Sequence, residues 1–197
     1  MNCYLLVGGM SRRMGSSKAE IEIGGRRFLD RVSDAAAAIF DSLVAVQRPG
    51  GDPIPGIRTI FEWEHESSGA MFGLQRALED GGPKLWLLGI DYPLITSRLL
   101  GDLRARFEQS SEPVLVPMSG GLPQMLCGGY SNALLETVND RIGRGELRMR
   151  SLLDLGAEIV SEQDWRSSHP GEPLLNVNDP LTLEHARKIH EETHAYR

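Results

Sequence analysis

Two spacings of apolar residues alternate through the first half of the chain. Short apolar runs predict buried strands, and segments with an apolar residue every three or four positions predict helices with one buried face. The predicted strands cover residues 3–7, 42–47, 57–61 and 85–90, and the predicted helices cover 28–39, 69–80 and 97–109. Gly24-Gly25 is expected to turn a short extended piece directly into the first helix. The alternation indicates βαβ units, so we expect an α/β fold with a doubly wound, mostly parallel sheet.

The second half of the chain departs from this alternation. A glycine turn at 119–121 separates extended segments at 114–117 and 122–130, which predicts an antiparallel hairpin and therefore a mixed sheet. The elements expected next are a helix over 132–139, a charged loop over 141–150, an edge strand over 157–161, a surface loop over 161–172 and a short strand or turn over 174–178. Asp179 as N-cap and Pro180 at the first helical position predict a final helix that continues to His190.

Composition narrows the class of protein. The 197 residues are 41% hydrophobic and 24% charged, which suits one domain, residues 1–197, with an ample core. A formal net charge of -6 argues against a general nucleic-acid-binding surface. No apolar run reaches the roughly 18 residues that a membrane span needs, and Met1 leads straight into a core-like strand, so we expect a cytoplasmic protein with no membrane partner. Cys3 and Cys127 lack C-x-x-C partners and are expected to be reduced and buried.

A glycine-flanked basic loop follows the first predicted strand. Glycines can present backbone N–H groups to a phosphate without a Cβ in the way, and the basic side chains offset phosphate charge. The residues concerned are Gly8, Gly9, Arg12, Arg13, Gly15 and Lys18. The loop matches neither G-x-G-x-x-G nor G-x-x-x-x-G-K-[ST]. A nucleotide-triphosphate loop and an ordinary basic strand-to-helix connection both fit these residues.

Polar oxygens gather at two other places in the chain. Asp91 follows the most apolar predicted strand, and ligands of doubly wound sheets bind at the carboxyl ends of strands. Asn176 to Asp179 supply further oxygens near the end of the chain. Mg²⁺ takes one or two carboxylates together with phosphates and waters, so Asp91 suits a metal–triphosphate site. Caps or Asx-turns are the structural alternative for Asp91 and for Asn178.

Three other chemistries are weaker candidates. His190-Glu191-Glu192-Thr193-His194 fits the H-E-x-x-H zinc pattern, but it lies at the end of the last helix without an obvious third ligand. A solvated, charged helix end explains it. Cys127 has no neighbouring histidine base, and no G-x-S-x-G elbow is present, so neither a catalytic thiol nor an acyl-transfer serine is expected.

The loop from Leu6 to Ala19 resembles the signature loop of the molybdenum cofactor guanylyltransferases (MobA type) in the nucleotidyltransferase superfamily. The shared spacing is G-G-x-S-x-R-M-G-x-x-K-A, and three later segments are similar to motifs of the same family. They are Gly89 to Ile95, Leu122 to Tyr130, and Leu175 to Pro180. The similarity spans nearly the whole chain and implies a single Rossmann-like nucleotidyltransferase domain with helices on both faces of a mixed sheet.

The resemblance implies an activity and a set of site residues. The enzyme would transfer GMP from GTP to the terminal phosphate of molybdopterin, release pyrophosphate and use Mg²⁺, with molybdoenzyme-assembly proteins as further candidate partners. Leu6, Val7, Gly8, Gly9 and Gly15 would hold the nucleotide, Lys18 its phosphates, and Asp91 both phosphates and metal. Asn176 and Asn178 would lie near the acceptor phosphate, with Asn178 also on the metal. Arg13 is added as a catalytic residue because of its charge.

Two positions depart from the family pattern. Gln47 and Glu62 stand where the family often has Asn and Asp that help to hold the nucleoside, so contact with guanine or ribose would change. Two rivals therefore stay open. One is a related cytidylyl or sugar-phosphate nucleotidyltransferase, although Gly8-Gly9 resembles the guanylyl branch. The other is a non-catalytic nucleotide-binding or cofactor-binding adaptor.

Overall fold

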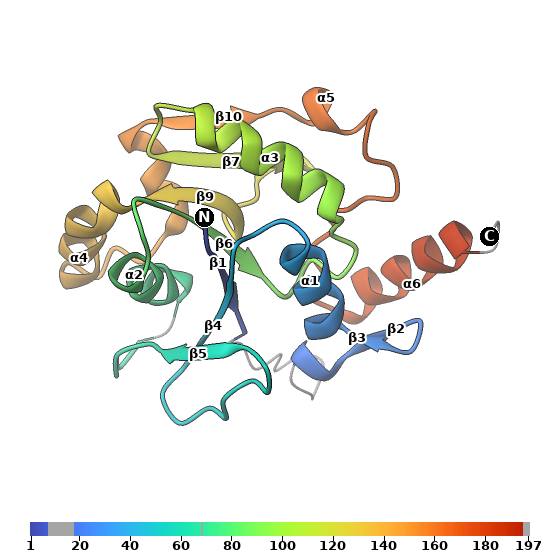
Figure 1. The fold of residues 1–197 in the computed structure, drawn as a ribbon, viewed down its shortest axis with the longest axis horizontal. Helices are drawn as coiled ribbons and strands as arrows, with labels where there is room; N and C mark the ends of the chain where they lie inside the picture. The colour runs from blue at the N-terminus through green and yellow to red at the C-terminus, as the bar shows by residue number, and fades with distance from the viewer. Residues whose placement is uncertain (8–17, 68, 195–197) are drawn as a thin grey trace.

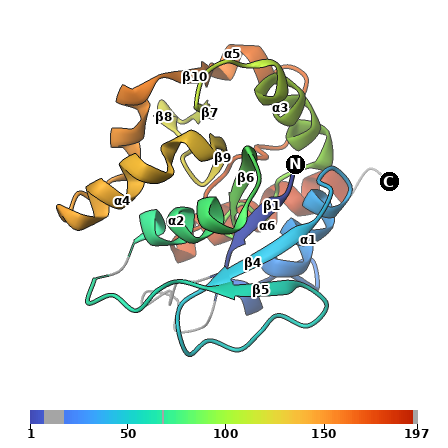
Figure 2. The same cartoon turned by 60° about the vertical axis from the view of Figure 1, so that its left-hand side comes forward.

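The computed structural model of the protein describes residues 1–7, 18–67 and 69–194. Within this part of the chain, eight strands form one sheet in the order β10-β7-β9-β6-β1-β4-β5, with β8 paired to β7 (Figure 1). The strands of this sheet are β1 (Cys3–Leu6), β4 (Leu43–Gln47), β5 (Arg58–Phe61), β6 (Lys84–Gly89), β7 (Val114–Ser119), β8 (Leu122–Pro123), β9 (Cys127–Ser131) and β10 (Ala157–Val160). Figure 2 shows β6, β1, β4 and β5 side by side in that order.

The sheet is mixed, as the pattern of apolar segments predicts. β1 pairs in parallel with β4 and β6, β4 with β5, and β7 with β10. β9 lies between β6 and β7 and is antiparallel to both. Because β6 and β7 each run opposite to β9, their carboxyl ends lie at the same edge of the sheet as those of β1, β4 and β5. The residue that follows each of these strands therefore lies at the same edge of the sheet.

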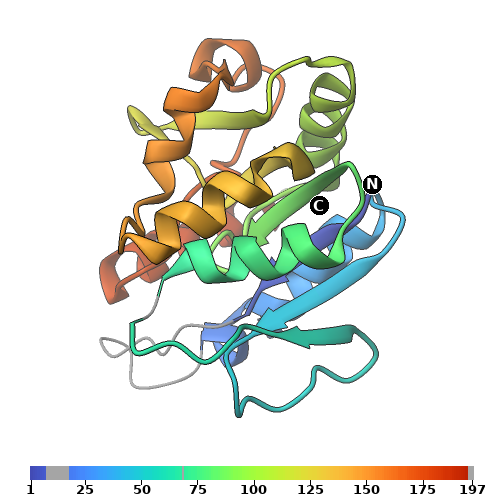
Figure 3. The same cartoon turned by 90° about the vertical axis from the view of Figure 1, so that its left-hand side faces the viewer.

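Helices cover both faces of the sheet. They are α1 (Phe28–Ala37), α2 (Ala70–Asp80), α3 (Ser97–Gln109), α4 (Leu135–Gly143), α5 (Glu162–Trp165) and α6 (Pro180–His194). Alternate strand residues point to opposite faces. Cys3, Leu5 and Trp86 pack in the core beneath α1 and α3, and Tyr4 and Leu87 pack in the core beneath α2 and α4. In Figure 3, α2 (green) and α4 (gold) lie side by side across the near face.

Several connections differ from the predicted ones. Gly24 and Gly25, both with positive φ, close a small hairpin of β2 (Glu22–Ile23) and β3 (Arg26–Arg27) before α1, because both can take the left-handed conformation of its turn. The expected hairpin arm at 122–130 is broken into β8 and β9, and only β9 enters the sheet centre.

The remaining differences lie in the second half. Instead of a helix over 132–139, a 3-10 turn (Asn132–Leu134) leads into α4, which continues to Gly143. The expected charged loop over 141–150 therefore begins as helix, and a further 3-10 helix covers Met149–Leu155. The expected surface loop over 161–172 contains α5. In the segment expected to be a short strand or turn, residues 173–174 form a turn and residues 175–178 have no regular secondary structure. α6 continues to His194, four residues beyond the predicted end. Among the helices of residues 1–7, 18–67 and 69–194, none has the length and apolarity that crossing a membrane requires.

Close packing in the centre of the sheet explains two glycines of β9. A Cβ at position 129 would overlap the ring of Phe107, which itself packs edge-on against Trp86. A Cβ at position 128 would lie 2.8 Å from the carbonyl oxygen of Leu115. These positions have no room for a side chain, so β9 can sit between β6 and β7 only with glycine there.

We predict that Gly129→Ala lowers the free energy of unfolding by about 1–3 kcal/mol, because the added methyl forces Phe107 out of place. Urea denaturation followed by circular dichroism measures this change. Gly82→Ala is the matched control, since a Cβ there meets nothing within 4 Å. An unchanged urea midpoint for Gly129→Ala would show that the core accommodates the added methyl group without loss of stability, and would contradict the crowding argument.

Candidate functional site

Asp91 is a buried carboxylate at the carboxyl end of β6. Its side chain is 11% exposed, and Oδ1 is fully enclosed without a hydrogen-bond partner in the described part of the chain. A Cβ at position 89 would overlap Asp91 Oδ1, so only glycine lets the carboxylate fold back against the end of its own strand. The strand thus places a charged group where little water reaches it.

Four polar side chains form a closed ring that includes this carboxylate. Asn176 Nδ2 donates to Asp91 Oδ2 at 2.8 Å, and Asn178 Nδ2 donates to Asn176 Oδ1. Lys18 Nζ donates to Asn178 Oδ1 and lies 4.0 Å from Asp91 Oδ2, a loose ion pair. We call Lys18, Asp91, Asn176 and Asn178 the carboxylate ring. The ring joins three segments that are far apart in the sequence.

The asparagines of the ring are held in place by the backbone on both sides of them. Val177 lies between them, is fully buried, and donates its backbone N–H to the carbonyl oxygen of Asp91 at 2.8 Å. Asp179 caps α6 as predicted, because its Oδ1 accepts from the backbone N–H of Thr182 at 2.9 Å. Figure 1 shows α6 beside the β2–β3 hairpin, where Ile23, Phe28 and Ala186 pack around Val177. The loop is therefore anchored between a core residue and a capped helix.

Burial sets the protonation behaviour of Asp91. Loss of solvent around the carboxyl raises its pKa, while the charge of Lys18 and the hydrogen bond from Asn176 act in the opposite direction without cancelling the burial. The ionised carboxylate is therefore held at a cost in stability. An additional cation or a phosphate-bound metal next to it would favour the ionised form.

Gln47 and Glu62 lie at the same edge, beyond β1. Gln47 ends β4, Glu62 follows β5, and the backbone N–H of Glu62 donates to the carbonyl oxygen of Gln47 at 2.8 Å. The Gln47 amide donates to the carbonyl oxygen of Asp52. The Glu62 carboxylate approaches Gly73, and its burial raises its pKa, with Arg48 lowering it. In the sheet, β1 lies between β6, which leads to Asp91, and the strands β4 and β5 that lead to these two residues.

A cavity of about 680 Å³ opens beside Glu62. Its walls come from residues 48–49 after β4 and 62–67 after β5, among them Arg48, Trp63 and His65. The Trp63 ring lies 4.7 Å from the Arg76 guanidinium and is 55% exposed. This cavity offers an exposed aromatic face together with acidic and basic groups.

Of the other residues of the predicted site, some lie at the site edge and the rest lie outside the described residues. Leu6 ends β1, paired with Gly89 and Val46, and the backbone N–H of Val7 donates to Val46 at 3.1 Å, so both lie at the site edge. The remaining residues of the predicted basic loop, among them Gly8, Gly9, Arg13 and Gly15, lie outside the described residues. Their assignment stays a prediction.

The zinc-like pattern at the end of α6 has a structural explanation at its first histidine. His190 Nδ1 lies 3.3 Å from Arg31 Nη2, and its ring fills the space beside Gly24. Within the described ranges, no three His, Cys, Asp or Glu side chains form a group that could hold a metal. Cys3 and Cys127 are buried free thiols in the structure, and burial raises the pKa of each.

The carboxylate ring fits a magnesium site completed by substrate phosphates. Mg²⁺ needs few protein oxygens when phosphates and waters complete its coordination. Asp91 supplies one carboxylate, whose Oδ2 faces the ring, and Asn178 supplies an amide oxygen that Lys18 contacts.

One connection near Asp91 was not predicted from the sequence. The Tyr92 hydroxyl donates to Gln124 Oε1 at 3.1 Å, and Gln124 Nε2 donates to the carbonyl oxygens of Ser119 and Leu122, each at 2.9 Å. Tyr92 is only 1% exposed. Gln124 thereby ties the β7–β8 hairpin to the residue next to Asp91. Its place within the segment from Leu122 to Tyr130, which is similar to a family motif, was the only sequence signal.

Solved structures share this fold. Molybdopterin-guanine dinucleotide biosynthesis protein A from Archaeoglobus fulgidus superimposes with a TM-score of 0.83 at 22% identity, covering 98% of this chain and 100% of that one. A 2-C-methyl-D-erythritol 4-phosphate cytidylyltransferase from Thermus thermophilus superimposes with a TM-score of 0.68 at 17% identity, covering 94% of this chain and 97% of that one. At these identities the likeness shows the fold alone, which is that of the nucleotidyltransferases.

Sequence comparison defines the family. The family model for the MobA-like NTP transferase domain matches residues 3–164. A probable molybdenum cofactor guanylyltransferase from Aquifex aeolicus (strain VF5) is 31% identical over 179 residues, which cover 89% of this chain and 85% of that protein. The chain therefore belongs to the MobA-like NTP transferase family and is a nucleotidyltransferase.

We predict that Asp91→Asn stabilises the fold at neutral pH. A carboxyl with a raised pKa in the folded chain keeps its proton longer than in the unfolded chain, so stability falls as pH rises from the ordinary carboxyl pKa through the raised one. The variant removes this loss. Its melting temperature should exceed that of the parent at neutral pH, and the difference should shrink in acid.

Differential scanning calorimetry over a pH series measures this difference. Asp140→Asn is the control, because Asp140 is an exposed carboxylate on α4 paired with Arg144. Such surface changes usually alter stability by less than about 0.5 kcal/mol. A lower melting temperature for Asp91→Asn at neutral pH would contradict the burial argument.

Proposed function

We propose that this protein transfers GMP from GTP to the terminal phosphate of molybdopterin and releases pyrophosphate. The observation that carries the proposal is the carboxylate ring, in which a buried Asp91 and the Lys18 ammonium meet at the carboxyl ends of parallel strands. The family supplies the substrate class, because relatives of this chain are named probable molybdenum cofactor guanylyltransferases. Ligands of such sheets bind at this edge.

The proposed reaction is an in-line attack by an acceptor phosphate oxygen on the α-phosphorus of GTP. The P–O bond to the leaving pyrophosphate breaks as the new P–O bond forms, and the anionic nucleophile needs no covalent enzyme intermediate. The chain's task is then to position two anionic substrates and offset their charge. The positive charge of Lys18 offsets the negative charge of the donor phosphates, and Asn176 orients the Asp91 carboxylate.

Asp91 and Asn178 are the residues that would hold Mg²⁺ in this reaction. When bound, Mg²⁺ offsets charge on the α-phosphate and the departing pyrophosphate. In this proposal the amide groups of Asn176 and Asn178 lie near the acceptor phosphate. We extend the same proposal to the basic loop, with Arg13 and Lys18 as its cations and with Gly8, Gly9 and Gly15 close to the phosphates.

The cavity beside Glu62 is the proposed place of the nucleoside. A carboxylate accepts the N1–H and amino group of guanine, which adenine and cytosine do not present together. Glu62 is half-buried and lines this cavity, and Gln47 ends the adjacent strand. A cytidylyltransferase shares the fold, so choice of base is the point on which the rival enzyme differs.

We predict pyrophosphate release with GTP and molybdopterin together, and little release with ATP, CTP or UTP or without the acceptor. Asp91→Asn should lower kcat by about 10²–10³-fold, because a preorganised charge next to the reacting phosphates is lost. A coupled pyrophosphate assay measures both effects. Turnover that prefers CTP would favour the cytidylyl rival, and absence of turnover with every nucleotide would favour the adaptor.

Lys18→Ala tests the phosphate role separately. The Michaelis constant for GTP should rise by about tenfold or more, because a charged hydrogen bond to phosphate is removed. Lys188→Ala is the matched control, since Lys188 is an exposed lysine paired with Glu184 on α6. Unchanged GTP kinetics in Lys18→Ala would remove Lys18 from the site.

A further inference from the structure

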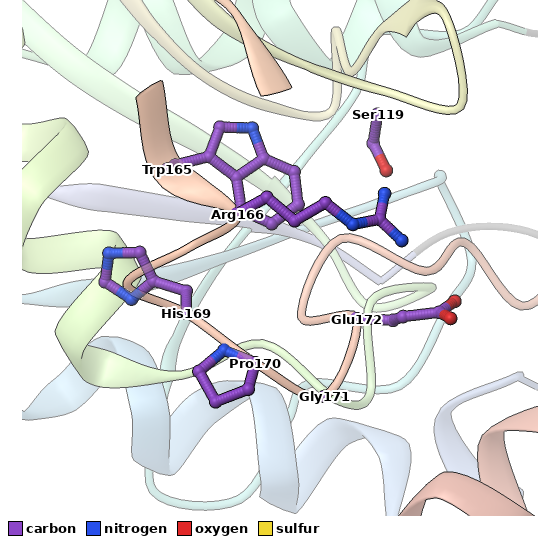
Figure 4. A pocket seen from close by; sticks show the side chains of 7 residues that line it. All are labelled: Ser119, Trp165, Arg166, His169, Pro170, Gly171 and Glu172. Carbon is purple, nitrogen blue, oxygen red and sulfur yellow. The ribbon is translucent and has the colours of Figure 1, made fainter. Parts of the chain in front are cut away.

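A second cavity lies at the same edge of the sheet, under the segment that leads to α6. Its volume is about 310 Å³, and its walls come from Ser119 at the end of β7, Trp165 and Arg166 at the end of α5, and residues 169–172 (Figure 4). Asp91 follows β6, which lies between β1, β4 and β5 on one side and β9, β7 and β10 on the other. The two cavities are therefore on opposite sides of Asp91.

Two short connections join this cavity to the carboxylate ring. Glu172 is four residues before Asn176, a span of at most about 14 Å in an extended chain. Ser119 is joined to Tyr92 through the side chain of Gln124, which binds the Ser119 carbonyl and the Tyr92 hydroxyl. A molecule of moderate size can reach from the cavity to the ring.

The walls of the cavity are held by buried contacts. Trp165 is 4% exposed, and its Nε1–H donates to the carbonyl oxygen of Met118 at 3.0 Å. The side chain of His169 is 3% exposed, and its Nε2 lies 3.0 Å from Asp102 Oδ2 on α3. Both rings are buried although the segment that carries them is mostly polar. Their buried contacts hold the walls of the cavity in a fixed shape.

The polar groups of the cavity suit a ring that both donates and accepts hydrogen bonds. In the view of Figure 4, the Arg166 side chain crosses Trp165 and its guanidinium lies between the Ser119 hydroxyl and the Glu172 carboxylate. Arg166 Nη1 donates to Glu162 at 2.9 Å, which engages one of its five N–H groups. Glu172 Oε2 lies 3.2 Å from His185 Nε2, and a carboxylate has further acceptor sites.

We propose that this cavity binds the pterin ring of the acceptor, with Arg166 and Glu172 as the residues that recognise it. The assignment rests on the proposed function, which supplies a pterin as the acceptor. The ring's amino group and N–H donate to Glu172, and its carbonyl oxygen and ring nitrogens accept from Arg166 and Ser119. The acceptor phosphate then extends toward Asn176. The family match ends at residue 164, so this cavity belongs mainly to the part of the chain beyond it.

Steady-state kinetics with purified molybdopterin and GTP tests the assignment. Arg166→Ala and Glu172→Gln should each raise the Michaelis constant for molybdopterin by about tenfold or more and leave that for GTP unchanged. Arg144→Ala is the matched control, because Arg144 forms the same i, i+4 ion pair on α4 outside the cavity. An unchanged molybdopterin constant in both cavity variants, or equal increases for both substrates, would overturn the assignment.

Direct binding separates this inference from the proposed function. Neopterin, which carries the same amino-oxo ring without the reactive phosphate, is titrated and its own fluorescence followed. Wild-type and Arg144→Ala proteins should bind it, and Arg166→Ala and Glu172→Gln should bind it about tenfold more weakly or not at all. Specific binding without pyrophosphate release from any nucleotide would support the cavity and contradict the transfer reaction. Equal binding by all four proteins would contradict the cavity.

Discussion

The burial of one carboxylate, that of Asp91, is the constraint on which the site depends. A charged group removed from water is unfavourable unless other charges and hydrogen bonds compensate it. Lys18 and Asn176 provide part of that compensation, and the pKa of Asp91 remains raised. A group kept at such a cost in an otherwise well-packed core is typical of a residue retained for chemistry. Gly89, Asn176 and the cap of α6 all serve to hold this carboxylate in one place.

The sheet divides the substrates of the proposed reaction around that carboxylate. β6 leads to Asp91. On one side of β6 lie β4, which ends at Gln47, and β5, which is followed by Glu62; on the other side lies β7, which ends at Ser119. A donor nucleotide on the first side and an acceptor on the second would meet at the carboxylate ring. Group transfer between two bound anions requires such a meeting point more than it requires a reactive side chain. The proposed reaction therefore relies on positioned charge and needs no covalent intermediate on the protein.

The sequence patterns predict most of the strands and the position of Asp91, because long apolar runs mark buried strands wherever they occur. They do not predict the ring contacts. Lys18 and Asn178 are 160 positions apart, and only tertiary structure brings them together. The cavity beside α5 is missed for a different reason. Trp165 and His169 are single buried residues in a polar segment, and isolated buried residues produce no periodic signal. The crowding that requires Gly129 is likewise invisible without the position of Phe107.

The fate of the α-phosphate of GTP is the most direct test of the proposed chemistry. GTP labelled at the α-phosphate is incubated with molybdopterin, Mg²⁺ and the protein, and the products are separated and identified by mass spectrometry. Transfer as proposed puts the label into a product that contains both guanosine and the pterin, with no label on the protein, and Asp91→Asn forms that product far more slowly. Label recovered only as GTP or GMP, or attached to the chain, would contradict it.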